Sequence, residues 1–234
     1  MLYPGRLILA AALIALGTTP AGAAPSSPYP SMASLDKYRS ARLTDEIALA
    51  RSAAPAFISN HAEILVLGLH GYDVAVKGTN GFVCIVERAW SIDVDSPEFW
   101  DPKLRGPLCL NAAAARSVLP EYLMRTQWVL SGATREQVAA RIKAAVASNK
   151  ITAPETGSMC YMQSKYGYLN ERVAGPWHPH LMFFLPPTAA AQWGANEPGS
   201  PVAAAVESIE PITVFMVPIA KWSDGTLDRR EPTM

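Results

Sequence analysis

Residues 63–89 read EILVLGLHGYDVAVKGTNGFVCIVERA, and their alternation of apolar runs and turns is the main indication of the fold. Three apolar runs of strand length, 63–69, 74–77 and 82–89, are separated by short turns. The second turn, residues 78–81, contains an Asn-Gly pair, which tight hairpins favour because it tolerates positive φ angles. Such short connections predict three consecutive strands in an antiparallel meander.

Helices are predicted for the middle of the sequence, where capping signals are frequent. Asn111 is expected to cap a first helix. Pro120 suits the first turn of a second helix, which Gly132 ends. Thr134 and Gln137 have the spacing of a capping box at the start of a third helix.

Three further runs, residues 158–162, 179–185 and 212–219, have strand character. The alanine-rich residues 202–206 favour a short helical turn. The total is about six strands, with the helices inserted between the third and the fourth. Separate groups of strands and helices are typical of the α+β class. We therefore expect a single α+β domain whose largely antiparallel sheet carries the helical insertion on one face.

The first 23 residues have the organisation of a cleavable signal peptide. Arg6 supplies a positive charge, residues 7–16 form an apolar run, and residues 21–23 (AGA) match a cleavage site. The apolar run is too short for a stable membrane span. We expect an exported protein, periplasmic or extracellular, without a stable membrane anchor after cleavage.

The expected organisation of the chain follows from this leader and from composition. A signal peptide at 1–23 precedes an arm at 24–42 that is rich in Pro, Ser and Ala and is expected to be mobile. The α+β domain is expected at 43–225. A charged, flexible tail is expected at 226–234.

The charge balance bears on the partners of the chain. Twenty basic and twenty acidic residues give a formal net charge of zero, and the basic residues form no cluster. Nucleic acids attract proteins through positive charge, so the sequence argues against a nucleic-acid partner. The expected partner is a small molecule or another envelope protein.

Three cysteines allow at most one internal disulfide and leave one thiol. We predict a Cys84–Cys109 bridge, because Cys109 lies in a Gly-Pro-rich stretch that can move to meet its partner. Cys160 lies in an apolar run and is expected to be a buried free thiol. The alternative for Cys160 is a nucleophile activated by a histidine.

Two of the four histidines lie in the segment Trp177-His178-Pro179-His180, directly before an apolar run. Residues two apart in extended backbone point to the same face. His178 and His180 therefore suggest a divalent-metal site, with His70 as the third ligand. The alternative is a pair of structural histidines that bind loop carbonyls and stack on Trp177.

Several tryptophans lie in or beside predicted loops, where large aromatic side chains can line a ligand pocket. The predicted binding residues are Trp177, His178, His180 and Trp193. The alternative is that these rings seal the ends of the sheet, since Trp is highly buried on average.

Two function hypotheses result. The first is a periplasmic binding or structural module with an aromatic-lined loop surface. The second is a metal-dependent hydrolase or metal-binding protein that uses His178 and His180, with a metal-bound water as nucleophile. Whether the chain is an enzyme stays open, because the sequence contains neither a Gly-x-Ser-x-Gly elbow nor a Cys-x-x-Cys motif.

Overall fold

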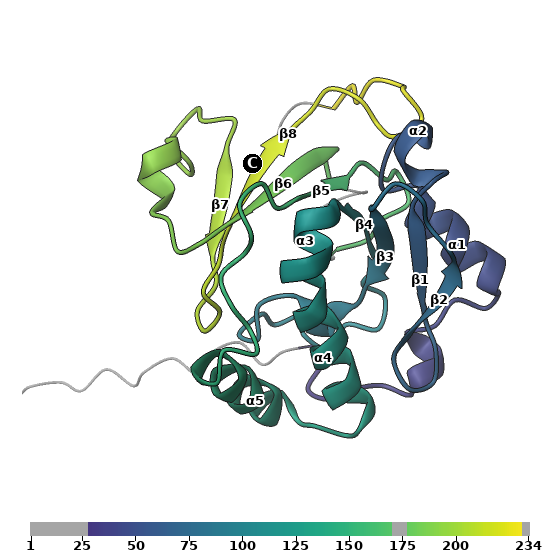
Figure 1. Cartoon of the computed structure of the whole chain (residues 1–234), viewed down its shortest axis with the longest axis vertical. Helices are drawn as coiled ribbons and strands as arrows, with labels where there is room; N and C mark the ends of the chain where they lie inside the picture. Colours follow the sequence, from purple (N-terminus) through teal and green to yellow (C-terminus); the bar gives the residue numbers. More distant parts are fainter. Residues whose placement is uncertain (1–27, 170–176, 231–234) are drawn as a thin grey trace, which may run out of the picture.

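An eight-stranded sheet forms the centre of the computed structural model, which describes residues 28–169 and 177–230 (Figure 1). The strand order is β2-β1-β3-β4-β5-β6-β8-β7, and only the β1–β3 pair is parallel. The α+β class is confirmed, whereas the expected count of about six strands is too low. The strands are β1 (Glu63–Leu67), β2 (Tyr72–Val76), β3 (Val83–Glu87), β4 (Gly106–Leu110), β5 (Met159–Met162), β6 (His180–Leu185), β7 (Ala203–Val206) and β8 (Thr213–Pro218).

The first three strands do not form the expected meander, because β1 lies between β2 and β3. β2 folds back on β1 as a hairpin, and residues 77–82 then cross the start of β1. Thr79 N donates to His61 O at 2.8 Å in this crossing. A Cβ on Gly78 would clash with the backbone nitrogen of Glu63, so the crossing needs glycine. The GTNG segment is therefore a crossover rather than a hairpin turn.

Two strands form where the sequence gives no strand signal. β4 begins with Gly106-Pro107, and β7 has the sequence AAAV, which favours a helical turn. β4 pairs with β3 along its whole length, and β7 does the same with β8. Pairing with a neighbouring strand overrides the local preference of both segments.

Helices cover both faces of the sheet, whereas the sequence predicted a layer on one face (Figure 1). α1 and α2 pack against the face that carries Ile64 and Val86. α3 and α4 cover the opposite face, which carries Ile85 and Leu108, and α5 packs beside α4. The helices are α1 (Leu43–Arg51), α2 (Ala56–Ser59), α3 (Ala112–Ser117), α4 (Leu119–Leu130) and α5 (Arg135–Ala147), with 3-10 turns η1 (Leu35–Lys37), η2 (Ala89–Ser91) and η3 (Ala190–Trp193).

The predicted helix caps are confirmed. The side-chain oxygen of Asn111 accepts a hydrogen bond from Ala114 N at 3.0 Å at the start of α3. Thr134 and Gln137 form both bonds of a capping box at the start of α5. Pro120 lies in the first turn of α4. These signals depend only on neighbouring residues, which explains why the sequence reveals them.

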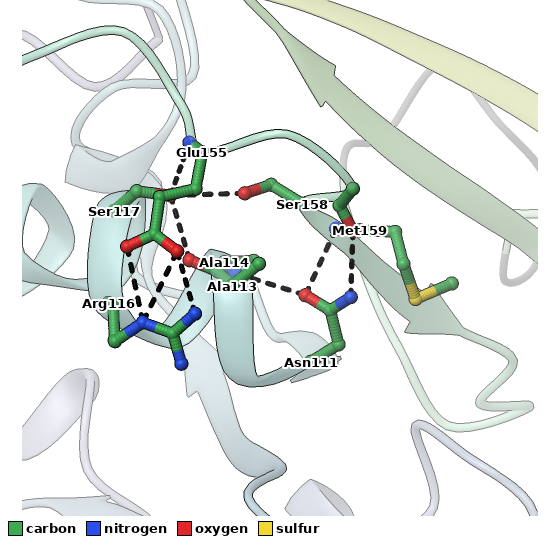
Figure 2. A network of polar contacts seen from close by, with 9 residues as sticks. Asn111, Ala113, Ala114, Arg116, Ser117, Glu155, Ser158 and Met159 are labelled. Carbon is green, nitrogen blue, oxygen red and sulfur yellow. Dashed lines mark hydrogen bonds and ion pairs between the residues drawn. The ribbon is translucent and has the colours of Figure 1, made fainter.

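A polar network extends from the cap of α3 to the loop that precedes β5 (Figure 2). The Asn111 amide donates to Gly157 O at 2.8 Å. Ser117 Oγ accepts from Glu155 N at 3.0 Å, and the Arg116 guanidinium forms an ion pair with the Glu155 carboxylate at 2.7 Å. The network holds α3 beside the entry to β5 and is structural.

The predicted Cys84–Cys109 disulfide is confirmed. The two residues lie directly opposite each other on β3 and β4, both are fully buried, and their sulfurs are bonded. The reason differs from the expected one, since Cys109 belongs to a strand rather than to a movable loop. Cys160 of β5 is a buried free thiol, as predicted. It packs in the core on the opposite face of the sheet, away from the disulfide.

The segment before α1 contributes to the core, although residues 24–42 are predicted as a mobile arm. Tyr38 is fully buried, its hydroxyl donates to Trp100 O at 2.9 Å, and its ring lies 4.9 Å from that of Trp90. The predicted signal peptide, residues 1–23, lies outside the described part of the chain. No described helix has the length and apolarity needed to cross a bilayer.

Candidate functional site

Three of the predicted binding residues lie together where the chain enters β6. His180 is the first residue of β6 and pairs across the sheet with Met162, the last residue of β5. The Trp177 and His180 ring centroids are 5.7 Å apart. Both rings line a small cavity of about 20 Å³ that Met162 and Ser164 also line.

His180 is held in one tautomer. Its Nδ1 lies 2.7 Å from the carbonyl oxygen of His178, so Nδ1 carries the proton and donates it. The residue is 4% exposed, and burial lowers its pKa. The ring is thus neutral, and Nε2 keeps its lone pair. Among the described residues, that buried Nε2 has no hydrogen-bond partner.

His178 makes a different set of contacts. Its Nδ1 lies 2.6 Å from a carboxylate oxygen of Asp228, whose side chain is buried. Arg230 also binds Asp228, and the hydrogen bonds from Arg230 and His178 hold the pKa of this carboxyl well below its usual range. The Arg230 guanidinium lies over the Trp222 ring, 5.0 Å from its centroid. This cluster fastens residues 226–230 to the entry of β6, in a segment predicted to be a flexible tail.

The structure does not bring His70 to the other two histidines. His70 is exposed in the β1–β2 turn, and the strands β3, β4 and β5 separate β1 from β6. Four strand spacings amount to roughly 19 Å. His178 and His180 use their Nδ1 atoms for separate protein partners. Across residues 28–169 and 177–230, no group of three or more His, Cys, Asp or Glu side chains is arranged to hold a metal ion.

Trp193, the fourth predicted binding residue, lies elsewhere. It stacks on Phe215 with ring centroids 4.4 Å apart, and its centroid is 6.1 Å from that of Phe183. Phe183 precedes Phe184 on β6 and therefore points to the face opposite His180. The ring of Trp193 covers the sheet, as the sealing alternative predicts.

A surface groove of about 260 Å³ opens beside the loop that follows β5. The end of α1 and the start of α2 form one wall, and the turn after β8 forms another. The hydroxyls of Ser52, at the end of α1, and Ser164, in the loop after β5, are joined by a 2.6 Å hydrogen bond. The groove is lined by Arg51, Ser52, Ala54, Ala56, Ser59, Lys165, Tyr166, Ser223 and Asp224.

The charges in this groove are not balanced internally. Lys165 Nζ lies 2.7 Å from Asp224, and that hydrogen bond lowers the pKa of Asp224 to about 2. Arg51, the last residue of α1, has a buried Nε without a hydrogen-bond partner in the described part of the chain. The groove therefore presents one guanidinium that no carboxylate among the described residues neutralises.

A second buried polar cluster lies under α4. Arg125 forms ion pairs with Glu121, at 2.9 Å, and with Glu210. Glu87 of β3 is 6% exposed nearby, and its carboxyl makes no hydrogen bond to the described residues. Burial raises the pKa of Glu87 to about 8, and Arg125 lowers it by less. Gly106, opposite Glu87 on β4, leaves the space that this carboxyl occupies.

Cys160 does not have the surroundings of a nucleophile. The thiol is fully buried, and burial raises its pKa well above the usual value. Reactive cysteines are exposed and have a lowered pKa. The interpretation as an apolar core residue is the one that fits this geometry.

Several residues of the site carried no signal in the sequence. Asp228 lies in the predicted tail, and Arg51 is a single arginine at the end of α1 with no motif around it. The ion pair between Lys165 and Asp224 joins residues 59 apart in the sequence, so no local pattern reveals it. Comparison of the chain with protein-family models, with curated proteins and with solved structures finds no match.

Proposed function

We propose that the chain is a binding protein for a small organic anion, which is held in the groove between α1, α2 and the turn after β8. The observation that carries this proposal is the unpaired Arg51 guanidinium in the groove. A guanidinium binds a carboxylate through two parallel hydrogen bonds, and such charge-assisted bonds are among the strongest that proteins make.

The other lining residues suit the remainder of such a ligand. Ser59 and Ser223 offer hydroxyl groups that can donate or accept, and Tyr166, which is 73% exposed, offers an aromatic face. The volume of about 260 Å³ fits a molecule near the lower end of the size range of ligand pockets. A small carboxylate with an apolar or hydroxylated body matches these features.

A larger groove of about 390 Å³ beside β2 is the weaker candidate. Its lining holds two arginines, Arg39 and Arg42, and two carboxylates, Glu46 and Asp73, so it presents no excess of positive charge. Two of the four are engaged in close ion pairs: Glu46 binds Arg88 at 2.6 Å, and Arg42 binds Asp45 at 2.8 Å. Groups that are satisfied within the protein contribute little to recognising a ligand, because binding would first break those pairs.

The test is a titration of the full chain with benzoate, glucuronate and inorganic phosphate, followed by amide chemical shifts. We expect at least one anion to shift resonances of residues 51–59, 164–166 and 222–225. Arg51→Gln should weaken that binding about tenfold or more. The matched control is Arg141→Gln, at an exposed position of α5, which should leave the affinity unchanged. Failure of all three anions to bind, or equal binding by Arg51→Gln, would contradict the proposal.

The same proposal includes export of the chain to the periplasm or the medium. Its support is the leader pattern of residues 1–23 together with the Cys84–Cys109 disulfide, since disulfides persist in oxidising compartments. Fractionation of cells followed by N-terminal sequencing should find a mature chain that begins at Ala24. A chain that stays in the cytoplasm and keeps Met1 would contradict export.

A further inference from the structure

The small cavity at the entry of β6 combines two observations that the proposed anion groove does not use. One is the buried Nε2 lone pair of His180, which has no partner among the described residues. The other is the Met162 side chain, which lines the same cavity and lies directly across the strand pair from His180. Cross-strand partners have Cβ atoms about 5 Å apart. An imidazole and a thioether side chain thus line the same small cavity.

From this geometry we infer that His180 and Met162 form a binding site for a single soft monovalent cation of the Cu(I) class. Thioether sulfur is a soft ligand that selects Cu(I), and imidazole binds copper as well. The cavity volume of about 20 Å³ has room for one occupant of about the size of a water molecule.

The charge of the cavity favours a monovalent ion over a divalent one. Among the described residues that line it, none is an aspartate or a glutamate. A doubly charged ion buried without a carboxylate would carry a large desolvation penalty. Neither ligand has to lose a proton to bind, because His180 Nε2 is already unprotonated and the thioether is neutral. This site differs from the expected divalent centre of His70, His178 and His180 in its ligands, its charge and its metal class.

The surroundings of His180 are those of a metal-ligating histidine. In metal sites, the ring nitrogen that does not bind the metal usually donates to a carbonyl or carboxylate, which orients the ring. His180 Nδ1 makes this bond to His178 O at 2.7 Å. His178 is in turn fixed by Asp228, so the carbonyl is held in place from two sides. The Trp177 indole, whose centroid is 5.7 Å from that of the His180 ring, also lines the cavity.

Silver is the first probe, because Ag(I) is as soft as Cu(I) and undergoes no redox change under the assay conditions. The full chain, with its disulfide intact, is titrated with silver nitrate in a buffer free of chloride and thiols. Nitrogen-15 spectra of the histidine side chains report on each ring separately. We expect one equivalent of Ag(I) to shift the Nε2 resonance of His180 while Nδ1 stays protonated. An unchanged His180 resonance would overturn the inference without the need for any variant.

Variants then separate this site from the free thiol, which also binds soft metals. In a Cys160→Ala background, Met162→Leu keeps the side-chain volume and removes the sulfur. It should weaken Ag(I) binding, and Cu(I) binding in competition with a chromophoric chelator, by at least about 10- to 100-fold. Met159→Leu is the matched control, since Met159 lies on the same strand and pairs with Phe183 on the other face. Equal affinity of the two leucine variants, or loss of all binding with Cys160→Ala alone, refutes the site.

Discussion

Glu87 and Arg88, two consecutive buried ionisable residues at the end of β3, are accommodated differently on the two faces of the sheet. On the face that α1 covers, the Arg88 guanidinium and the Glu46 carboxylate are both buried and form an ion pair at 2.6 Å. On the face that α4 covers, Glu87 is buried without a partner among the described residues, while Arg125 is occupied by Glu121 and Glu210. Arg88 and Glu87 are neighbours in the sequence, yet alternation along the strand sends their side chains to different environments.

A buried ionisable group can therefore be accommodated either by an ion pair or by loss of its charge. Arg88 also donates from Nε to Tyr38 O at 2.6 Å, so its guanidinium has both an ion-pair partner and a backbone acceptor. Glu87 instead keeps its proton, because burial raises its pKa to about 8. The stability contributed by the Arg88–Glu46 pair does not change with pH near neutrality, whereas the contribution of Glu87 does.

Breaking the ion pair should have the largest effect on stability. Arg88→Met leaves the Glu46 carboxylate buried and unpaired, so the free energy of unfolding should fall by about 3–5 kcal/mol. The double variant Arg88→Met/Glu46→Leu should recover part of that loss, because no isolated charge remains. Urea denaturation of the three proteins measures both values. A single variant as stable as the wild type would show that the pair contributes nothing.

Glu87→Gln should increase the free energy of unfolding by a similar amount, but only at high pH. The pKa of Glu87 is higher in the folded chain than in the unfolded chain. Its contribution to the free energy of unfolding is therefore fully present below the unfolded-state pKa of about 4.5 and is lost as the pH rises through about 8. The amide cannot ionise, so the variant should exceed the wild type by roughly 2–5 kcal/mol at pH 9 and equal it at pH 4.5. Arg125, Arg88 and Glu207 are the charged groups that act on Glu87. Parallel pH profiles for the two proteins would contradict this assignment.

Removing the disulfide should destabilise the α1 face by a somewhat smaller amount. The bridge joins residues 25 apart in the sequence, and a loop of this length corresponds to about 3.5 kcal/mol in the chain-entropy description. Cys84→Ala/Cys109→Ala is compared with the wild type by urea denaturation without reductant. Labelling of the unreduced, denatured wild type should find one thiol per chain, from Cys160, and three thiols would contradict the bridge.

The smallest effects are expected at the polar network of Figure 2, where charge is exposed. Asn111→Ala removes the cap of α3 and the bond to Gly157 O, and should cost about 1 kcal/mol. Arg116→Ala breaks an exposed ion pair with Glu155 and should cost less than about 1 kcal/mol. Thermal denaturation of both variants ranks them, and the reverse order would show that surface charge matters more here than the cap.

The parts of the fold that the sequence predicts are those that nearby residues determine. Asn111 and the Thr134–Gln137 pair mark helix starts correctly, because a cap involves atoms only a few residues apart. β4 and β7 escape prediction, because Gly106-Pro107 and the alanine run become strands only through pairing with β3 and β8. The insertion of β1 between β2 and β3 likewise depends on contacts between residues that are not neighbours in the sequence.

The candidate sites follow the same division. The sequence predicts a site at residues 177–180, and this segment does bring Trp177, His178 and His180 together. The third metal ligand expected, His70, is separated from the other two histidines by three strands. No local sequence pattern reveals this separation. Met162 lies beside His180 because β5 and β6 pair in this register. Asp228 lies beside His178 because residues 226–230 fold back onto the entry of β6.

The crossing at Gly78 has a consequence for the order of assembly. β2 and β3 are close in sequence, yet the slot between them is filled by β1, so β3 can dock only after or together with the β1–β2 hairpin. The hairpin consists of local contacts and can form early, whereas β4 and the disulfide depend on β3 being in place. The rate at which Cys84 and Cys109 become oxidised during refolding therefore reports how fast β3 and β4 pair, the last step in the assembly of the first four strands.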